Sequence, residues 1–302
     1  MRFLRQSGDA VISRRSTLGL LLAVVVSASV AGCSGCRRGD AGAAPKAESV
    51  YERIMRTGKI RAAYITYPPA VIKDTTTGKM TGTFVETLQQ IADNLELELE
   101  WTEEVGWGAQ IEGLAADRYD IVGSPVWANP TRGKLTTMSK PVYYSGVGAY
   151  VRKDDSRFDA SITAINSPDV RIVTIDGETG DLIARTQFSK AKRISLPQLT
   201  DISRLFLEVS TRKADVLFAE PFYGYKFLET NPGSVKNVAA DQPIRVLGNC
   251  YMFKKSEPQL KHMLDVAIED LQNSGFVDRV IKDYEPFPNT FYRVAQPIRI
   301  VE

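Results

Sequence analysis

Runs with the period of a strand and runs with the period of a helix alternate along most of this chain. The segment "KIRAAYI" has the pattern of a strand, and "FVETLQQIADNL" then places four apolar residues on one helical face, Phe84, Leu88, Ile91 and Leu95. The order begins again with the strand pattern "DVRIVTID" and the turn-into-helix pattern "GETGDLIARTQF". This alternation predicts an α/β architecture, and 302 residues are enough for one large domain or two lobes.

Composition restricts the functions that the chain can have. It carries 38 Lys and Arg against 36 Asp and Glu, with three cysteines and one histidine. A net charge of +2 gives no basic excess for a nucleic-acid partner. The scarcity of cysteine and histidine argues against a disulfide framework, a zinc site and most histidine-based catalysis. We therefore expect no metal and no cofactor.

The first 32 residues have the pattern of an export signal. Four arginines precede an apolar run at residues 18–26, and small residues follow it. The run is shorter than the roughly 20 residues of a transmembrane helix, and "SRRSTLGLLL" carries the arginine pair of a twin-arginine signal. Without residues 1–32, which hold four arginines and one aspartate, the chain has 34 basic and 35 acidic side chains. The exported chain is thus nearly neutral.

Two cysteines follow this segment in "VAGCSGC" with the spacing C-x-x-C. The residues "VAGC" resemble a bacterial lipobox, and this resemblance implies cleavage before Cys33 and lipidation of Cys33. The alternatives are a redox or metal-binding pair and an uncleaved membrane anchor. A redox pair belongs at a helix start inside a βαβ unit, whereas here small and polar residues follow. We interpret residues 33–49 as a flexible tether to a membrane, at the periplasmic face or the cell surface.

Six segments along residues 51–285 resemble, in order, those of the bacterial extracellular solute-binding proteins of family 3, the polar amino-acid receptors of ABC importers. Each segment alone is a weak signal, and their order over most of the chain makes the resemblance specific. The segments are "GKIRAAYITYPPAV", "GKMTGTFVETLQQIADNL", "QIEGLAADRYDIV", "NPTRGKLTTMSKPVYYSGVGAYVRKDD", "RIVTIDGETGD" and "KADVLFAEPF".

This resemblance implies the type II periplasmic-binding-protein fold, an α/β monomer of two lobes with a ligand cleft between them. It places residues 50–148 and 249–302 in lobe 1 and residues 149–248 in lobe 2. Two crossover strands would join the lobes, near residues 147–151 and 249–253. Glycines in and beside these segments suit strands that change their backbone angles when the lobes close.

The resemblance also assigns the groups that would hold an α-amino acid. Arg132 stands where the family places its carboxylate-binding arginine, and a guanidinium matches a carboxylate with two parallel N–H groups. Thr179 begins a helix whose N-terminus favours anions, although Thr179 or Asp176 could instead only cap that helix. Glu220 stands where many members have an Asp for the amino group. The alternatives are a surface role for Arg132 and a solvent-facing Glu220.

Aromatic residues mark the predicted side-chain pocket. Tyr67, Trp107 and Trp127 correspond to pocket positions of the family and would form an aromatic cage for an apolar, aromatic or cationic group. Ser124 retains a hydroxyl residue of the family pattern, and Tyr64 replaces an acid that several cationic amino-acid receptors carry in the first strand. The alternative is that these aromatics belong to the core of a lobe.

We therefore expect a membrane-anchored protein outside the cytoplasm that captures a small zwitterion, most simply an amino acid, for the permease of an ABC transporter. One alternative is an enzyme on the same fold, dehydratase-like, with Glu220 as a general acid or base. Another is a ligand-sensing lipoprotein without a transport role. The sequence favours the non-enzymatic reading because its single histidine lies far from the predicted cleft.

Overall fold

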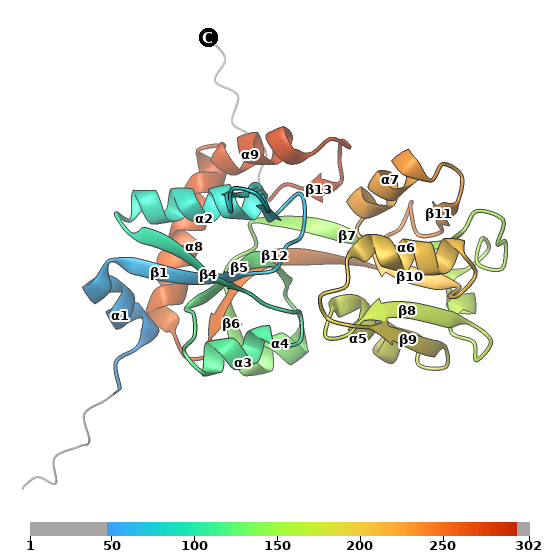
Figure 1. The fold of residues 1–302 in the computed structure, drawn as a ribbon, viewed down its shortest axis with the longest axis horizontal. Helices are drawn as coiled ribbons and strands as arrows, with labels where there is room; N and C mark the ends of the chain where they lie inside the picture. The colour runs from blue at the N-terminus through green and yellow to red at the C-terminus, as the bar shows by residue number, and fades with distance from the viewer. Residues whose placement is uncertain (1–46, 295–302) are drawn as a thin grey trace, which may run out of the picture. The chain divides into compact units, whose positions relative to one another are not determined.

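The computed structural model describes residues 47–294 of the chain (Figure 1). Residues 1–46 and 295–302 lie outside this description, and with them the predicted signal segment, the predicted lipidation site Cys33 and most of the predicted tether. Within residues 47–294, no helix has both the length and the apolar character that crossing a membrane requires.

Helices and strands alternate as predicted, which confirms the α/β class. The helices are α1 (Val50–Thr57), α2 (Thr83–Asn94), α3 (Gln110–Ala115), α4 (Pro130–Leu135), the 3-10 helix η1 (Ile162–Ile165), α5 (Thr179–Gln187), α6 (Ile202–Ser210), α7 (Pro221–Thr230), α8 (Pro258–Asn273) and α9 (Phe276–Tyr284). The strands are β1 (Lys59–Tyr64), β2 (Ile72–Lys73), β3 (Met80–Thr81), β4 (Glu98–Glu104), β5 (Ile121–Trp127), β6 (Thr136–Met138), β7 (Tyr143–Arg152), β8 (Arg171–Ile175), β9 (Lys192–Leu196), β10 (Val216–Ala219), β11 (Val235–Asn237), β12 (Arg245–Lys254) and β13 (Phe291–Tyr292).

The large sheet consists of two groups of strands that share β7. In the first lobe the order is β4-β1-β5-β12-β7, with β1 parallel to β4 and β5, and with β12 antiparallel to β5 and β7. In the second lobe the order is β7-β10-β8-β9, with β8 parallel to β9 and β10. Figure 1 shows helices on both sides of each group of strands. Both lobes are thus layered α/β units.

Two long strands, β7 and β12, connect the lobes (Figure 1). They pair with each other over residues 143–147 and 245–249. Strand β12 then continues beside β5 in the first lobe, whereas β7 continues beside β10 in the second. This is the predicted two-lobe type II fold with two crossover strands. The predicted lobe boundaries after residues 148 and 248 both fall within these strands.

The apolar stripe of α2 shows why the local pattern predicts its helix. Phe84, Leu88 and Ile91 have no exposed surface, and Leu95 packs against the same core. Their spacing puts them on the face that α2 turns toward the first lobe's sheet. This confirms the helix predicted from "FVETLQQIADNL".

Each lobe contains the same Asp–Arg pair, here called the Asp–Arg clamp, in which one carboxylate accepts hydrogen bonds from the backbone N–H and the guanidinium of one arginine. In the first lobe, Asp120 directly precedes β5, and its carboxylate accepts hydrogen bonds from Arg61 N at 2.7 Å and Arg61 Nη2 at 2.9 Å. In the second lobe, Asp215 directly precedes β10 and accepts from Arg171 N and Arg171 Nε, both at 2.9 Å. Each aspartate N–H donates back to the carbonyl of its arginine. The two lobes thus start equivalent strands in the same way.

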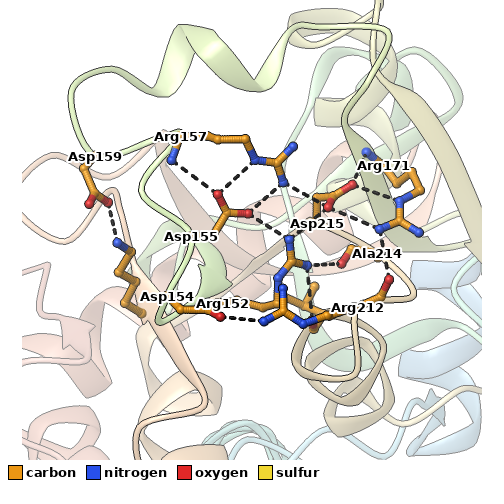
Figure 2. A network of polar contacts seen from close by, with 11 residues as sticks. Arg152, Asp154, Asp155, Arg157, Asp159, Arg171, Arg212, Ala214 and Asp215 are labelled. Carbon is orange, nitrogen blue, oxygen red and sulfur yellow. Dashed lines mark hydrogen bonds and ion pairs between the residues drawn. The ribbon is translucent and has the colours of Figure 1, made fainter.

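The clamp of the second lobe is part of a larger network, shown in Figure 2. Arg152 at the end of β7 and Arg157 also donate to Asp215, at 3.1 Å and 3.0 Å, and both donate to Asp155. Burial raises the pKa of Asp215, but the hydrogen bonds from Arg171, Arg152 and Arg157 outweigh it and hold this pKa well below its ordinary value. The network joins the end of β7 to the starts of β8 and β10.

The segment after α9 packs across the connection between the lobes. Its short strand β13 pairs with β7. The ring of Phe291 lies 5.1 Å from that of Tyr143 and 5.9 Å from that of Phe222 in α7, and Phe287 lies 5.8 Å from Phe222. Residues 287–292, for which the sequence offered no interpretation, therefore bridge elements of both lobes.

Candidate binding site

Arg132 is placed by the short helix α4. The side chain of Asn129 caps this helix and accepts a hydrogen bond from Arg132 N at 3.0 Å, and Pro130 occupies the first helical position. This start turns the arginine inward, and only 6% of Arg132 is exposed. The alternative of a surface arginine is therefore wrong.

The guanidinium of Arg132 spans the two lobes. Its Nη1 donates to Trp127 O at 2.9 Å and to Thr179 Oγ1 at 3.1 Å, and its Nη2 lies 3.4 Å from Gly177 O. Among residues 47–294, no carboxylate forms an ion pair with it within 4.0 Å. Burial lowers the pKa of Arg132 to about 10, although the charge of Glu178 opposes this shift. A buried cation without an ion pair favours a bound anion.

Glu178 and Thr179 form the start of α5. Glu178, rather than Thr179 or Asp176, is the capping residue, and its Oε2 accepts from Gly180 N at 2.6 Å. Burial raises the pKa of Glu178 to about 7, while the hydrogen bond from Gly180 N and the charge of Arg132 lower it. The hydroxyl of Thr179 instead faces Arg132.

Glu220 lies at the end of β10 and is 1% exposed, so the alternative of a solvent-facing acid is wrong. Its Oε1 accepts from Ser145 Oγ of β7 at 2.5 Å. Ser145 Oγ in turn accepts from Trp127 Nε1 at 3.0 Å and from Asn249 Nδ2 of β12 at 2.8 Å. Burial and the charge of Glu178 raise the pKa of Glu220 to about 7, although the bond from Ser145 lowers it. Within residues 47–294 this buried carboxylate forms no ion pair, and it is joined to β7 directly and to β12 through Ser145.

The predicted aromatic residues lie together around a small cavity. The ring of Tyr67 lies 5.5 Å from that of Trp107, edge to face, and 4.8 Å from that of Tyr223. The cavity measures about 10 Å³ and is lined by Tyr67, Trp107, Pro125, Trp127, Arg132, Glu178 and Thr179. This is room for about one water molecule.

Five of the predicted binding residues line this cavity, namely Tyr67, Trp107, Trp127, Arg132 and Thr179. Glu220 is linked to it through Ser145 and Trp127. Ser124 is not part of it, because its hydroxyl accepts from Ile65 N at 2.7 Å and donates to Ile65 O at 3.0 Å. This hydroxyl secures the end of β1.

The structure adds residues that the sequence reading missed. Glu178 lines the cavity, and its only sequence signal is its position between Gly177 and Thr179. Ser145 donates to Glu220 and Asn249 donates to Ser145, and both residues are fully buried. They stand on strands far from Glu220 in the chain, so no local pattern marks them.

A larger cavity of about 720 Å³ adjoins the small one and shares Tyr67, Trp107 and Glu178 with it. This volume is in the range of about 300–1,000 Å³ that holds small ligands. Residues from both lobes line it, including Ile65 of the first lobe and Phe206 of the second. The two cavities together follow the interface between the lobes.

Comparison with known proteins relates this architecture to one family. The family model of bacterial extracellular solute-binding proteins, family 3, matches residues 48–287. A probable amino-acid ABC transporter-binding protein of Haemophilus influenzae is 24% identical over 218 residues, which are 71% of this chain and 79% of that protein. A probable histidine-binding protein of Campylobacter jejuni is 23% identical, over 68% of this chain and 77% of that protein.

Solved structures share the fold. The ancestral amino acid-binding protein AncCDT-1, a precursor of cyclohexadienyl dehydratase, has a TM-score of 0.67 at 23% identity and covers 78% of this chain and 99% of its own. The substrate-binding protein AbpA of Streptococcus pneumoniae, bound to L-arginine, has a TM-score of 0.65 at 22% identity and covers 77% of this chain and 97% of its own. In both cases nearly the whole of the compared chain is similar to this protein, over both lobes.

Proposed function

This chain belongs to the bacterial extracellular solute-binding proteins, family 3, and we propose that it binds a small zwitterion, an amino acid, between its lobes for delivery to the permease of an ABC transporter. The observation that carries the proposal is Arg132, a buried guanidinium with no ion pair among residues 47–294, facing the start of α5 across the cleft. The printed names of the relatives above support an amino acid as the ligand.

The head group of an α-amino acid fits the charges of the cleft. Its carboxylate would take the donors of Arg132 and the hydroxyl of Thr179, each charge-assisted bond contributing about 1.5–3 kcal/mol. Its ammonium would meet Glu220, which lacks a cation in the described structure. Tyr67, Trp107 and Trp127 would surround the first atoms of the side chain. The binding roles of these residues are part of the proposal.

Ligand entry requires the lobes to separate. The cavity beside Arg132 holds about 10 Å³, and contacts between the lobes close it. Tyr223 Oη donates to Pro68 O at 2.5 Å, and Gly108 N donates to Gln198 Oε1 at 3.1 Å. Separation would bend β7 and β12, so that residues 50–148 with 249–302 move against residues 149–248.

The N-terminal segment supports a location outside the cytoplasm. The proposal includes export directed by residues 1–32 and lipidation of Cys33, with residues 33–49 as the tether. Acyl chains contribute about 0.8 kcal/mol for each buried methylene, so several would hold the protein at a membrane beside its transporter. Mass spectrometry of the membrane fraction tests this point, because Cys33→Ala is expected to lose the lipid mass.

Thermal unfolding in the presence of each amino acid tests the binding proposal. A ligand at about 100 times its dissociation constant stabilises the protein by about 2.7 kcal/mol. Arg132→Ala should abolish this shift. Arg56→Ala, which removes an exposed arginine paired with Glu48, serves as the control. If no zwitterion raises the melting temperature of the wild type, the proposal is wrong.

An enzymatic function is the second candidate, because Glu220 is a buried acid with a pKa of about 7 that is joined to the cavity wall through Ser145 and Trp127. One similar structure is described as the precursor of a dehydratase. Mass spectrometry of the ligand after incubation separates the candidates, since a binding protein returns its ligand unchanged. A sensor without a transport role would be distinguished by the absence of permease and ATPase genes beside its own.

A further inference from the structure

The proposed function gives Glu178 no part in holding an α-amino acid head group. In that proposal the ligand's carboxylate binds Arg132 and its ammonium binds Glu220, so Glu178 is left over as a second acid. Glu178 is half-buried, lines both cavities and forms no ion pair within 4.0 Å in residues 47–294. Its hydrogen bond to Gly180 N explains its position at α5 but does not neutralise its charge.

The ionised side chains of the closed cleft carry an excess of negative charge. Arg132 contributes one positive charge, whereas Glu178 and Glu220 contribute two negative charges when ionised. A zwitterion adds one charge of each sign and leaves this excess unchanged. A ligand with one further positive charge would bring the buried site to neutrality, which favours binding because uncompensated buried charge is costly.

The larger cavity provides room and chemistry for that charge beyond Glu178. Glu104 and Asp201 also line it. Its one lysine, Lys226, is paired with Glu229 at 2.7 Å on an exposed surface. The wall is otherwise rich in aromatic rings, Tyr67, Trp107, Phe206, Phe222 and Tyr223 among them. Such rings pack against an aliphatic stem and attract a cation at its end.

We propose that Glu178 receives the cationic end of the ligand's side chain, so that the site selects amino acids that carry an amine or a guanidinium. This inference rests on the proposed function of the cleft. The first strand does not supply the opposing charge, because Tyr64 Oη is occupied by a hydrogen bond from Lys73 Nζ at 2.6 Å. Glu104 and Asp201 line only the larger cavity, whereas Glu178 of the second lobe also lines the small cavity beside Arg132 and is therefore the acid next to the head group.

The test compares ligands that differ in charge and little in length. Isothermal titration calorimetry of the protein at about pH 8, above the pKa of about 7 of both Glu178 and Glu220, would measure lysine against norleucine and arginine against citrulline. We expect each cation to bind at least about tenfold more tightly than its neutral counterpart, or about 1.4 kcal/mol. Glu178→Gln keeps the length of the side chain and should reduce this ratio to below about threefold. Glu98→Gln, a change in the exposed ion pair of Glu98 with Lys59, should leave it intact.

The outcomes separate this inference from the proposed function. If norleucine or citrulline binds as tightly as its cationic counterpart, the inference is wrong and the proposed function stands. If Glu178→Gln retains the full preference, the assignment to Glu178 is wrong. If neither these four ligands nor any other amino acid binds the wild type, the proposed function falls as well. The wild-type comparison needs no variant, so poor folding of Glu178→Gln leaves the test decisive.

Discussion

The exchange Glu220→Gln should raise the stability of the unliganded protein at neutral pH while it weakens ligand binding. The pKa of Glu220 rises from 4.5 to about 7 on folding, with burial as the first cause. Between these two values the folded protein holds a proton that the unfolded chain has released. Stability contributed by this proton is complete below the lower value and is lost as pH rises through the higher one. At about pH 8 the loss amounts to about 3 kcal/mol.

Urea denaturation without ligand, at several values between about pH 5 and pH 8, measures this effect. The wild type should lose stability over the interval, and Glu220→Gln should remove about 2.5 kcal/mol of that loss. Glutamine is close in shape, and its carbonyl can still accept the hydrogen bond from Ser145. Glu229→Gln, outside the cleft, should leave the pH dependence unchanged. An unaltered pH dependence in Glu220→Gln, or lower stability than the wild type at about pH 8, would refute the reasoning.

Two other substitutions test the network and the closed cleft. Asp215→Asn should lower the free energy of unfolding by about 3 kcal/mol, because it deprives buried Arg152 of an ion-pair partner. Denaturant titration measures this loss. The control is Asp154→Asn, which breaks an exposed ion pair with Arg212 and should cost under about 1 kcal/mol. Gly177→Ala should weaken ligand binding at least about tenfold, since Gly177 has a φ of 76° and a Cβ there would lie 2.7 Å from Gly108 Cα across the cleft. Calorimetry checks this against Gly133→Ala, where a Cβ meets no atom within 4 Å.

Local sequence patterns predicted the helices and strands because the burial of each element requires apolar residues at the spacing of that element. The apolar residues Phe84, Leu88 and Ile91 of α2 are fully buried, and all seven residues of β5 are buried. Arg132 and Thr179 were predicted from the resemblance to a family, and the structure brings them to 3.1 Å. Periodicity alone does not indicate this contact, because the two residues belong to different lobes.

The remaining features depend on pairings between distant segments. Ser124 was predicted to face a ligand, yet Ile65, 59 residues away, occupies its hydroxyl. Ser145 meets Glu220 across 75 residues. The sequence offered Thr179 or Asp176 as the cap of α5 and gave no role to Glu178, which the structure shows to line both cavities. Such features arise from the tertiary fold, so residue types and spacing do not reveal them.

The path of β12 has a consequence for the order in which the molecule can assemble during synthesis. Strand β5 is buried along its whole length and needs β12 on one side, where Cys250 pairs with Val126 and Phe253 with Ile121. A nascent chain that has not yet reached residue 245 therefore presents β5 with an unpaired apolar edge, which invites aggregation. The second lobe's strands β8–β10 are complete before that point. We therefore expect the first lobe, whose synthesis starts first, to complete its folding after the second lobe.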